Sequence, residues 1–440
     1  MRTGSPDRHR AGGRRRVRRG RGCSGVLQGA AAVIFGEETT DLRAASASPL
    51  HAAFAEYSQA NAWTAINGFA FARRYGEFLS EYDALTNGCA AVDLSVLRRY
   101  SLRGPEAAAA LARLSSAPTG ELRPGESGRG LILDARGGVA DLCEVTRLAP
   151  ELFLLTTTAP GIRRLTLAVR GLDVHTEDIG DNLAALGLFG PGARDAAAAA
   201  GFEVDVDGAA AQVRVRGVES FARPTSLGRS IGLELIFPGD EALAIWERLR
   251  RTASPLPVGI DACEVARLEG GTPRPAIDFP RADETPGQDG RSPSEIGLPH
   301  LAPVDKAWFT GRRALAARPD RFTLIPALID ADEILAGAAV RLVGGRSRSA
   351  RGDGVVGEVR SARHSPFFRG AIGFVEIDLA AAGEAINPET LRPREGAEIR
   401  VDANNGRAAL ASALETHEWR LAAAYRRRRR DATESARAAV

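Results

Sequence analysis

The sequence predicts an α+β protein that ends in a small antiparallel β-barrel. Two segments, 90–114 and 186–200, share one pattern: an apolar strand, a Gly-Pro break and an Ala-rich helix. From about residue 322 onward the chain carries several short strands of alternating polarity, which is typical of a small barrel. Helix-bearing units followed by a strand-rich end together indicate the α+β class.

Length and charge divide the chain further. Because 440 residues are long for one core, more than one domain is expected. The net charge of +3 hides nine Arg and one Asp in residues 1–22 and five Arg in 426–430, so the body is near −10. We therefore expect a disordered basic extension at 1–45, folded units at 46–320, a barrel at 321–420 and a disordered basic tail at 421–440.

The same composition excludes several classes of protein. Basic charge confined to the terminal runs argues against a nucleic-acid-binding body. No apolar run approaches the roughly 18 residues of a membrane helix, and segment 24–35 is short and followed by acids, so a cytoplasmic protein is expected. The four cysteines and six histidines are scattered, which predicts neither a disulfide framework nor a metal site.

The elements follow in order along the chain. Helix-like composition marks 50–62 and 76–87, and the glycines and prolines of 280–294 predict a surface loop. Further helices are expected at 241–251 and 261–269. Strands are predicted at 152–157, 212–220 and 231–237, and in the barrel at 339–342, 355–359, 371–377 and 398–401.

Residues 131–145, LILDARGGVADLCEV, predict a β-hairpin whose turn holds Gly137 and Gly138. Asp141 follows this turn among apolar neighbours, where burial could raise its pKa and fit it for acid or base work. The alternative is a solvated carboxylate at a hairpin end. Glu234 lies between Leu233 and Leu235 on a strand, so it faces the side opposite both, either toward solvent or toward a ligand.

Seven segments in colinear order, from about residue 48 to 401, resemble one known family. They are SPLH at 48–51, AVDLSVLRRYSLRGPEA at 91–107, LGLFGPGA at 186–193, VGIDACEVARLEGG at 258–271, PSEIGL at 293–298, DKAWFTGRRAL at 305–315 and GEVRSARHSPFFRGAIGFVEID at 357–378. The family is that of the aminomethyltransferases, the T-protein of the glycine cleavage system and its folate-binding relatives.

The resemblance implies a three-part, cloverleaf-like fold whose central hole holds tetrahydrofolate. It implies that a carboxylate after the Gly-Gly pair, Asp141, meets the folate amines where the one-carbon unit is transferred. It also implies that Glu234 holds the pterin, whose adjacent N–H donors a carboxylate can accept together. Residues 46–320 would then be the folate-binding units.

The chain departs from the family pattern at several positions. The family hairpin carries two consecutive acids, and an ungapped alignment places Leu142 at the second, more important one. A slip of one residue would give that role to Asp141 and reverse the face of its side chain. The signature helix has Cys263 and Glu264 in place of the family's folate-contacting Arg and acid.

Three further residues are candidates for folate contact. Arg267 and Glu269 lie on the signature helix, and Arg363 flanks the Ser-Pro pair, where it could neutralise the folate tail. The alternatives are helix packing for the first two and an exposed barrel arginine for Arg363.

Two functions follow from the resemblance. The first is a tetrahydrofolate-dependent aminomethyl or methyl transferase with a divergent donor. Its partners would be a small-molecule one-carbon donor or a lipoyl-type carrier protein, with a separately encoded oxidase as a further partner. The second is a folate-binding accessory or regulatory protein without catalysis. Neither involves nucleic acid, a membrane or a metal.

Overall fold

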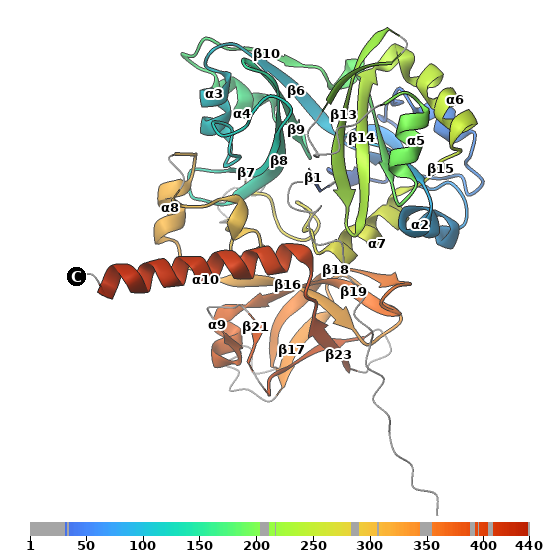
Figure 1. The fold of residues 1–440 in the computed structure, drawn as a ribbon. Helices are drawn as coiled ribbons and strands as arrows, with labels where there is room; N and C mark the ends of the chain where they lie inside the picture. Colours follow the sequence, from blue (N-terminus) through green and yellow to red (C-terminus); the bar gives the residue numbers. More distant parts are fainter. Residues whose placement is uncertain are drawn as a thin grey trace, which may run out of the picture.

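The computed structural model describes residues 31–32, 35–202, 211–215, 217–282, 290–305, 308–343, 354–387, 392–394, 396–403 and 408–438. Two sheet-based units lie side by side above a barrel, and a long C-terminal helix runs between the upper units and the barrel (Figure 1). The α+β class and the C-terminal antiparallel barrel predicted from the sequence are confirmed.

The first unit is built on a seven-stranded mixed sheet in the order β1-β13-β14-β11-β5-β15, with β12 paired to β13. Its strands are β1 (Ala31–Ala32), β5 (Ala90–Asp93), β11 (Leu183–Phe189), β12 (Ala211–Val215), β13 (Val218–Leu227), β14 (Ser230–Pro238) and β15 (Leu256–Pro257). Its helices are α1 (His51–Ala55), α2 (Phe78–Asn87), α5 (Ala193–Ala199), α6 (Ala242–Thr252) and α7 (Ile260–Gly270). Helices α5 and α6 bury apolar side chains in one core cluster, and α2 and α7 in another, so the sheet is covered on both faces.

The second unit is a five-stranded antiparallel sheet in the order β10-β6-β9-β8-β7, packed against two helices. Its elements are β6 (Arg98–Arg103), α3 (Ala107–Leu114), β7 (Ser127–Leu133), β8 (Val139–Ala149), β9 (Leu152–Thr157), α4 (Ile162–Ala168) and β10 (His175–Asp178). A smaller sheet holds β2 (Glu38–Thr39), β3 (Ala62–Ile66) and β4 (Phe69–Arg74). The predicted hairpin is confirmed as β7–β8, and Gly137 takes the positive φ of 80° that its turn requires.

The barrel closes in the order β16-β19-β18-β17-β22-β23 around an apolar core. Its strands are β16 (Phe322–Ile329), β17 (Ala339–Val343), β18 (Val355–Ser365), β19 (Gly370–Asp378), β22 (Glu398–Asp402) and β23 (Ala408–Ala413). Short elements complete the described chain: β20 (Ile386–Asn387), β21 (Arg392–Pro393), α8 (Arg312–Ala317), α9 (Leu379–Ala382), and the 3-10 turns η1 (Gly180–Asn182), η2 (Gly239–Glu241), η3 (Pro299–Leu301) and η4 (Gly383–Ala385). Helix α10 (His417–Ala438) ends it.

Four regions differ from the sequence predictions. The strand expected over 212–220 is two antiparallel strands, because β12 ends at Val215 and the chain turns back into β13 at Val218. The helix expected over 50–62 ends at Ala55, because the following residues enter the β3–β4 hairpin. Residues 35–45, expected to be disordered, bury Phe35 and pair Glu38 with Arg73. The tail expected to be disordered at 421–440 is helical to residue 438, since the first turns of α10 bury Trp419 against the barrel core.

Three parts of the sequence analysis lie outside the described residues: most of the N-terminal extension, residues 283–289 of the predicted surface loop, and Lys306 of the segment that resembles the family at 305–315. Among the helices of the described residues, none is both long enough and apolar enough to span a bilayer.

Candidate functional site

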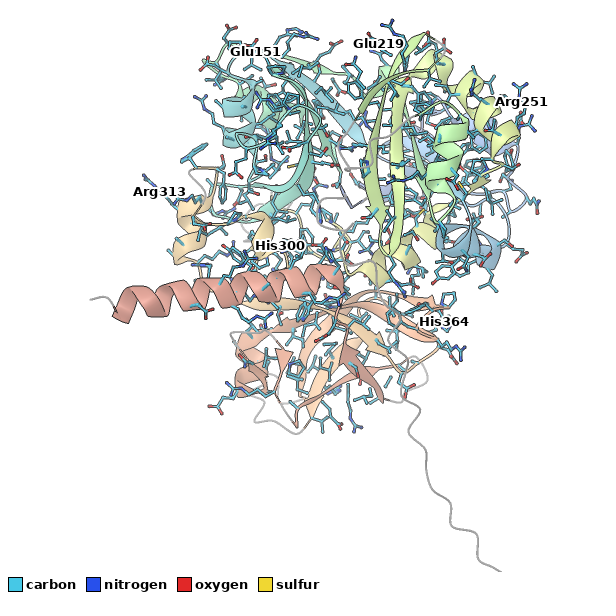
Figure 2. All side chains as sticks on the ribbon, in the orientation of Figure 1. Glu151, Glu219, Arg251, His300, Arg313 and His364 are labelled. Carbon is cyan, nitrogen blue, oxygen red and sulfur yellow. The ribbon has the colours of Figure 1, made fainter. Side chains whose placement is uncertain are left out.

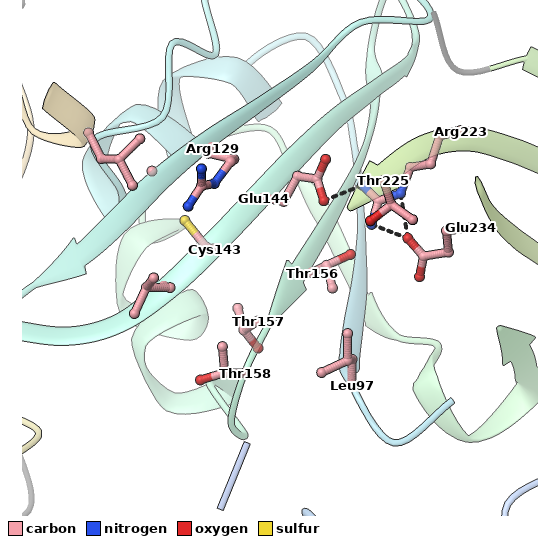
Figure 3. Close-up of a pocket in the computed structure, with 13 residues that line it drawn as sticks. Leu97, Arg129, Cys143, Glu144, Thr156, Thr157, Thr158, Arg223, Thr225 and Glu234 are labelled. Atoms are coloured by element: carbon pink, nitrogen blue, oxygen red, sulfur yellow. Dashed lines mark hydrogen bonds and ion pairs between the residues drawn. The ribbon is translucent and has the colours of Figure 1, made fainter. Parts of the chain in front are cut away.

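A polar pocket opens between the two upper sheets. Strands β7, β8 and β9 form one wall and the β13–β14 hairpin forms the other (Figure 3). Leu301 of η3 is also a lining residue. The pocket therefore lies where the two sheet-based units face each other.

Arg223 links the two acids of this pocket. The hairpin register sets Arg223 directly across from Glu234, and its Nε donates to Glu234 Oε2 at 2.6 Å. Its Nη1 lies 2.7 Å from Oε2 of Glu144 on the opposite wall (Figure 3). Arg99, fully buried on β6, donates from Nη2 to Glu234 Oε1 at 2.5 Å. The result is a buried chain of alternating charge that joins both sheets.

Burial and charge act on these acids in opposite directions. Burial would raise the pKa of Glu234, but Arg223 and Arg99 outweigh it and hold that pKa below its ordinary value. Burial also raises the pKa of Glu144, and there the nearby Glu234 adds to the rise, so Arg223 and Arg129 oppose it without overcoming it. Glu234 is therefore the fixed anion of the pocket, and Glu144 is the acid closer to exchanging a proton.

Several pocket atoms have no partner among the residues that the structure describes. Oε1 of Glu144 accepts no hydrogen bond there, since its recorded contacts run through Oε2 to Arg223. The buried Thr156 hydroxyl and Nη2 of Arg129 are likewise without a hydrogen-bond partner in the described chain. Buried polar atoms are costly when left unpaired, so this lining is suited to a ligand with both donors and acceptors.

The structure places Leu142, and not Asp141, along the pocket wall. In the β7–β8 register Asp141 pairs with Ile132 and Leu142 with Leu131, so their side chains leave the strand on opposite faces. The Asp141 carboxylate is 2 % exposed and accepts hydrogen bonds from the Thr158 hydroxyl and the backbone N–H groups of Leu142 and Ala159.

Arg281 lies 3.4 Å from the second oxygen of Asp141. Burial raises the pKa of Asp141, and Arg281 and the Thr158 hydroxyl oppose that rise. Thr158, whose hydroxyl donates to Asp141, is itself among the residues that line the pocket.

The other predicted residues are not gathered at this pocket. Arg267 is fully buried on α7, where it pairs with Glu264 at 2.8 Å and Asp278 at 2.6 Å. Arg363 is exposed on β18, and its Nη1 donates to the neighbouring Ala362 carbonyl at 2.9 Å. Glu269 lines a different pocket near the barrel. Of the five predicted site residues, Glu234 alone is among those lining the pocket described above.

Sequence reasoning missed Arg99, Arg223, Glu144 and Arg129. One signal was available: a hairpin turn at Gly228 and Arg229 sets residue 223 across from 234, which pairs an arginine with a glutamate. A second was Glu144 itself, an acid inside the apolar run of the β8 strand.

The fold and the pocket together define a three-part α+β protein with a charged pocket between its first two units. Residues 49–286, more than half of the chain, match the GCVT N-terminal domain, and the chain belongs to this family. The resemblance found in the sequence is thereby confirmed.

Named relatives agree with this assignment. An aminomethyltransferase of Streptomyces coelicolor is 26% identical over 331 residues, covering 72% of this chain and 86% of the relative. One from Thermus thermophilus is 27% identical over 328 residues, covering 72% and 87%. The crystal structure of the glycine cleavage system aminomethyltransferase T from Bartonella henselae superimposes with a TM-score of 0.70 at 20% identity, covering 85% of this chain and 98% of that one.

Proposed function

We propose that the pocket between the two sheets binds tetrahydrofolate and that the protein is a one-carbon transferase of the aminomethyltransferase type with a divergent donor. The observation that carries the proposal is the Glu234 carboxylate, fixed at the pocket wall by Arg99 and Arg223. Membership of the GCVT family is the reason for proposing folate as the ligand. The Glu234 carboxylate is the group on this wall that would hold the pterin ring.

The lining offers the donors and acceptors that a reduced folate needs, while the cavity of about 40 Å³ would have to widen to admit the ring system. A carboxylate has about four acceptor positions, and the three recorded contacts of Glu234 leave one of them on Oε1 for a pterin N–H donor. Thr156 and Arg129 offer unpaired donors for a ring carbonyl or nitrogen acceptor. Leu97, Leu142 and Leu301 supply the apolar contact that a ring system needs.

Bound tetrahydrofolate would supply the amines that accept the one-carbon unit. We assign to Glu144, instead of Asp141, the carboxylate that faces those amines, because its Oε1 has no recorded hydrogen bond and it lines the pocket. Its charge would stabilise the cationic nitrogen, and its raised pKa suits it to hold a proton in transfer. Asp141 becomes a positioning residue that fixes Thr158.

The donor is a small molecule or a lipoyl-type carrier protein, and a separately encoded oxidase is a further partner within the proposal. Purified protein mixed with tetrahydrofolate and amine, sulfonium or methoxy donors should form methylene- or methyl-tetrahydrofolate, detected by chromatography. Glu144→Gln should slow turnover about 100-fold or more. Asp141→Asn should slow it less. Equal rates for wild type and Glu144→Gln would refute the role of Glu144.

The second candidate is a folate-binding protein without transfer chemistry. One observation favours it: Leu142 stands at the wall position where the resemblance expects the more important acid. Folate binding by calorimetry, together with no product from any donor, would select this candidate. No folate binding at all would exclude both.

A further inference from the structure

A second pocket lies where the first unit meets the barrel. Helix α2, the end of α7, the β13–β14 turn and the β18–β19 turn line it, and in Figure 1 α2 and α7 lie at the edge of the first unit that faces β18 and β19. Its volume is about 500 Å³, which is in the range of small-molecule sites. It shares no lining residue with the pocket between the sheets.

Glu269 is the buried acid of this second pocket. It is 4 % exposed, and its Oε1 accepts hydrogen bonds from the Tyr82 phenol at 2.8 Å and the Ser365 hydroxyl at 2.6 Å. Within the described chain, no donor is recorded for Oε2. Burial raises the pKa of Glu269, with Ser365, Tyr82 and the nearby Arg229 opposing it. A carboxylate held by neutral donors inside a cavity gains most from a cationic ligand.

Arg229 supplies the opposite charge at the mouth of the pocket. Its guanidinium carbon lies 3.4 Å from the centroid of the Phe367 ring, and it makes no recorded hydrogen bond to a described residue. The turn that carries it is pinned to α7, because a Cβ atom on Gly228 would lie 1.6 Å from the Ala266 carbonyl oxygen. The Arg229 guanidinium is therefore held near Glu269, and its five N–H donors are available to bind an anion.

The same pocket presents apolar surface between the two charges. Leu85 lies in the wall, and Ile231 and Phe367 are 37 % and 55 % exposed at the rim. Exposed large apolar side chains beside a concave polar site are typical of ligand contact.

We propose that this pocket is a binding site for a free amino acid with an apolar side chain. The ammonium group pairs with Oε2 of Glu269, the carboxylate pairs with the Arg229 guanidinium, and the side chain packs against Leu85 and Ile231. A zwitterion satisfies both charges at once, whereas a simple amine or a simple acid leaves one of them unpaired. The site is separate from the folate pocket and does not depend on the function proposed there.

Calorimetry on the full chain tests the proposal with L-leucine, L-methionine and L-phenylalanine as probes. Saturable binding of one molecule per chain is expected for at least one of them. The N-acetyl and amide forms of that probe, which lack the ammonium and the carboxylate charge respectively, should each bind about tenfold or more weakly. Equal binding of all three forms would overturn the proposal.

Two variants and a matched control complete the test. Arg229→Gln changes an exposed turn residue and should weaken the probe about tenfold or more, and Glu269→Gln should do the same while keeping an oxygen for Tyr82 and Ser365. Arg214→Gln, at an exposed arginine of β12 outside the pocket, should leave the affinity unchanged. Absence of binding by wild type to every probe at about 10 mM would show that Glu269 only ties α2, α7 and the barrel together.

Discussion

Replacing Glu234 with glutamine keeps the size of the side chain and removes the charge that two buried arginines share. Breaking a buried ion pair by removing one partner costs about 3–5 kcal/mol of unfolding free energy. In this variant Arg223 would retain its ion pair with Glu144 at 2.7 Å. Arg99 would retain its hydrogen bonds to the carbonyls of Leu94 and Leu97, at 2.9 and 3.1 Å. We therefore expect a loss at the lower end, about 3 kcal/mol.

Scanning calorimetry measures this loss. For a cooperative unit of about 150–250 residues, 3 kcal/mol corresponds to a fall in Tm of about 6–12 °C. Glu219→Gln is the matched control, because Glu219 lies at the far end of β13, exposed and 3.1 Å from Arg214 (Figure 2). An exposed pair of this kind contributes about 0–1 kcal/mol, so its Tm should change by no more than about 4 °C.

The stabilisation that Glu234 contributes should depend on pH in one direction. Since the pKa of Glu234 is held below its ordinary value of 4.5, its stabilisation is complete above that pH and is lost as the pH falls through the lowered pKa. The difference in Tm between wild type and Glu234→Gln should therefore shrink in acid. The reasoning is refuted if Glu234→Gln lowers Tm no more than Glu219→Gln at neutral pH.

Three further predictions concern other parts of the site and its support. Leu142→Asp restores an acid to the pocket wall and should raise the rate of one-carbon transfer about tenfold or more, whereas an unchanged or lower rate would count against a missing acid there. Glu418→Gln weakens the 2.6 Å contact from α10 that orients Arg129 and should reduce tetrahydrofolate affinity about threefold to tenfold by calorimetry, with unchanged affinity as the contrary result. Burial would raise the pKa of Glu264, but Arg267 and Arg274 outweigh it and lower that pKa to about 2, so the stabilisation from this carboxylate, about 3 kcal/mol, is present above pH 4.5 and lost toward pH 2. The difference in Tm between wild type and Glu264→Gln should accordingly shrink as the pH is lowered toward 2. A difference that stays constant over this range would contradict the prediction.

Local patterns predicted much of the fold. The barrel strands, the β7–β8 hairpin and helices α6 and α7 follow from periodicity and turn residues within a few positions of one another. Glu234 could be predicted as a site residue because the family resemblance points to a single position on a strand with a clear sequence pattern. These features depend on neighbours close in the sequence.

The remaining features depend on contacts distant in the sequence. Arg99 meets Glu234 across 135 positions, and no local pattern encodes such a pairing. The face of Asp141 depended on one residue of register, which the bulge between Ile132 and Leu133 helps to set. The arginine run of α10 suggested disorder because like charges repel, yet the burial of Trp419 and Ala422 anchors the start of the helix.

Contacts of α10 also connect the C-terminus with the pocket. Its Glu418 lies between Arg129, which lines the pocket, and His300 of η3, which lies against the helix (Figure 2). Burial would raise the pKa of Glu418, but Arg129 and His300 outweigh it and hold that pKa well below its ordinary value, so Glu418 is ionised near neutral pH.

Calorimetric titration of wild type with tetrahydrofolate, beside Glu234→Gln at a temperature where both are folded, tests the central claim most directly. Wild type should bind one molecule per chain, and the variant should bind about tenfold or more weakly, because a charged hydrogen bond to the pterin is lost. No saturable binding by wild type, or equal affinity in the two proteins, would contradict the claim that Glu234 holds a folate in this pocket.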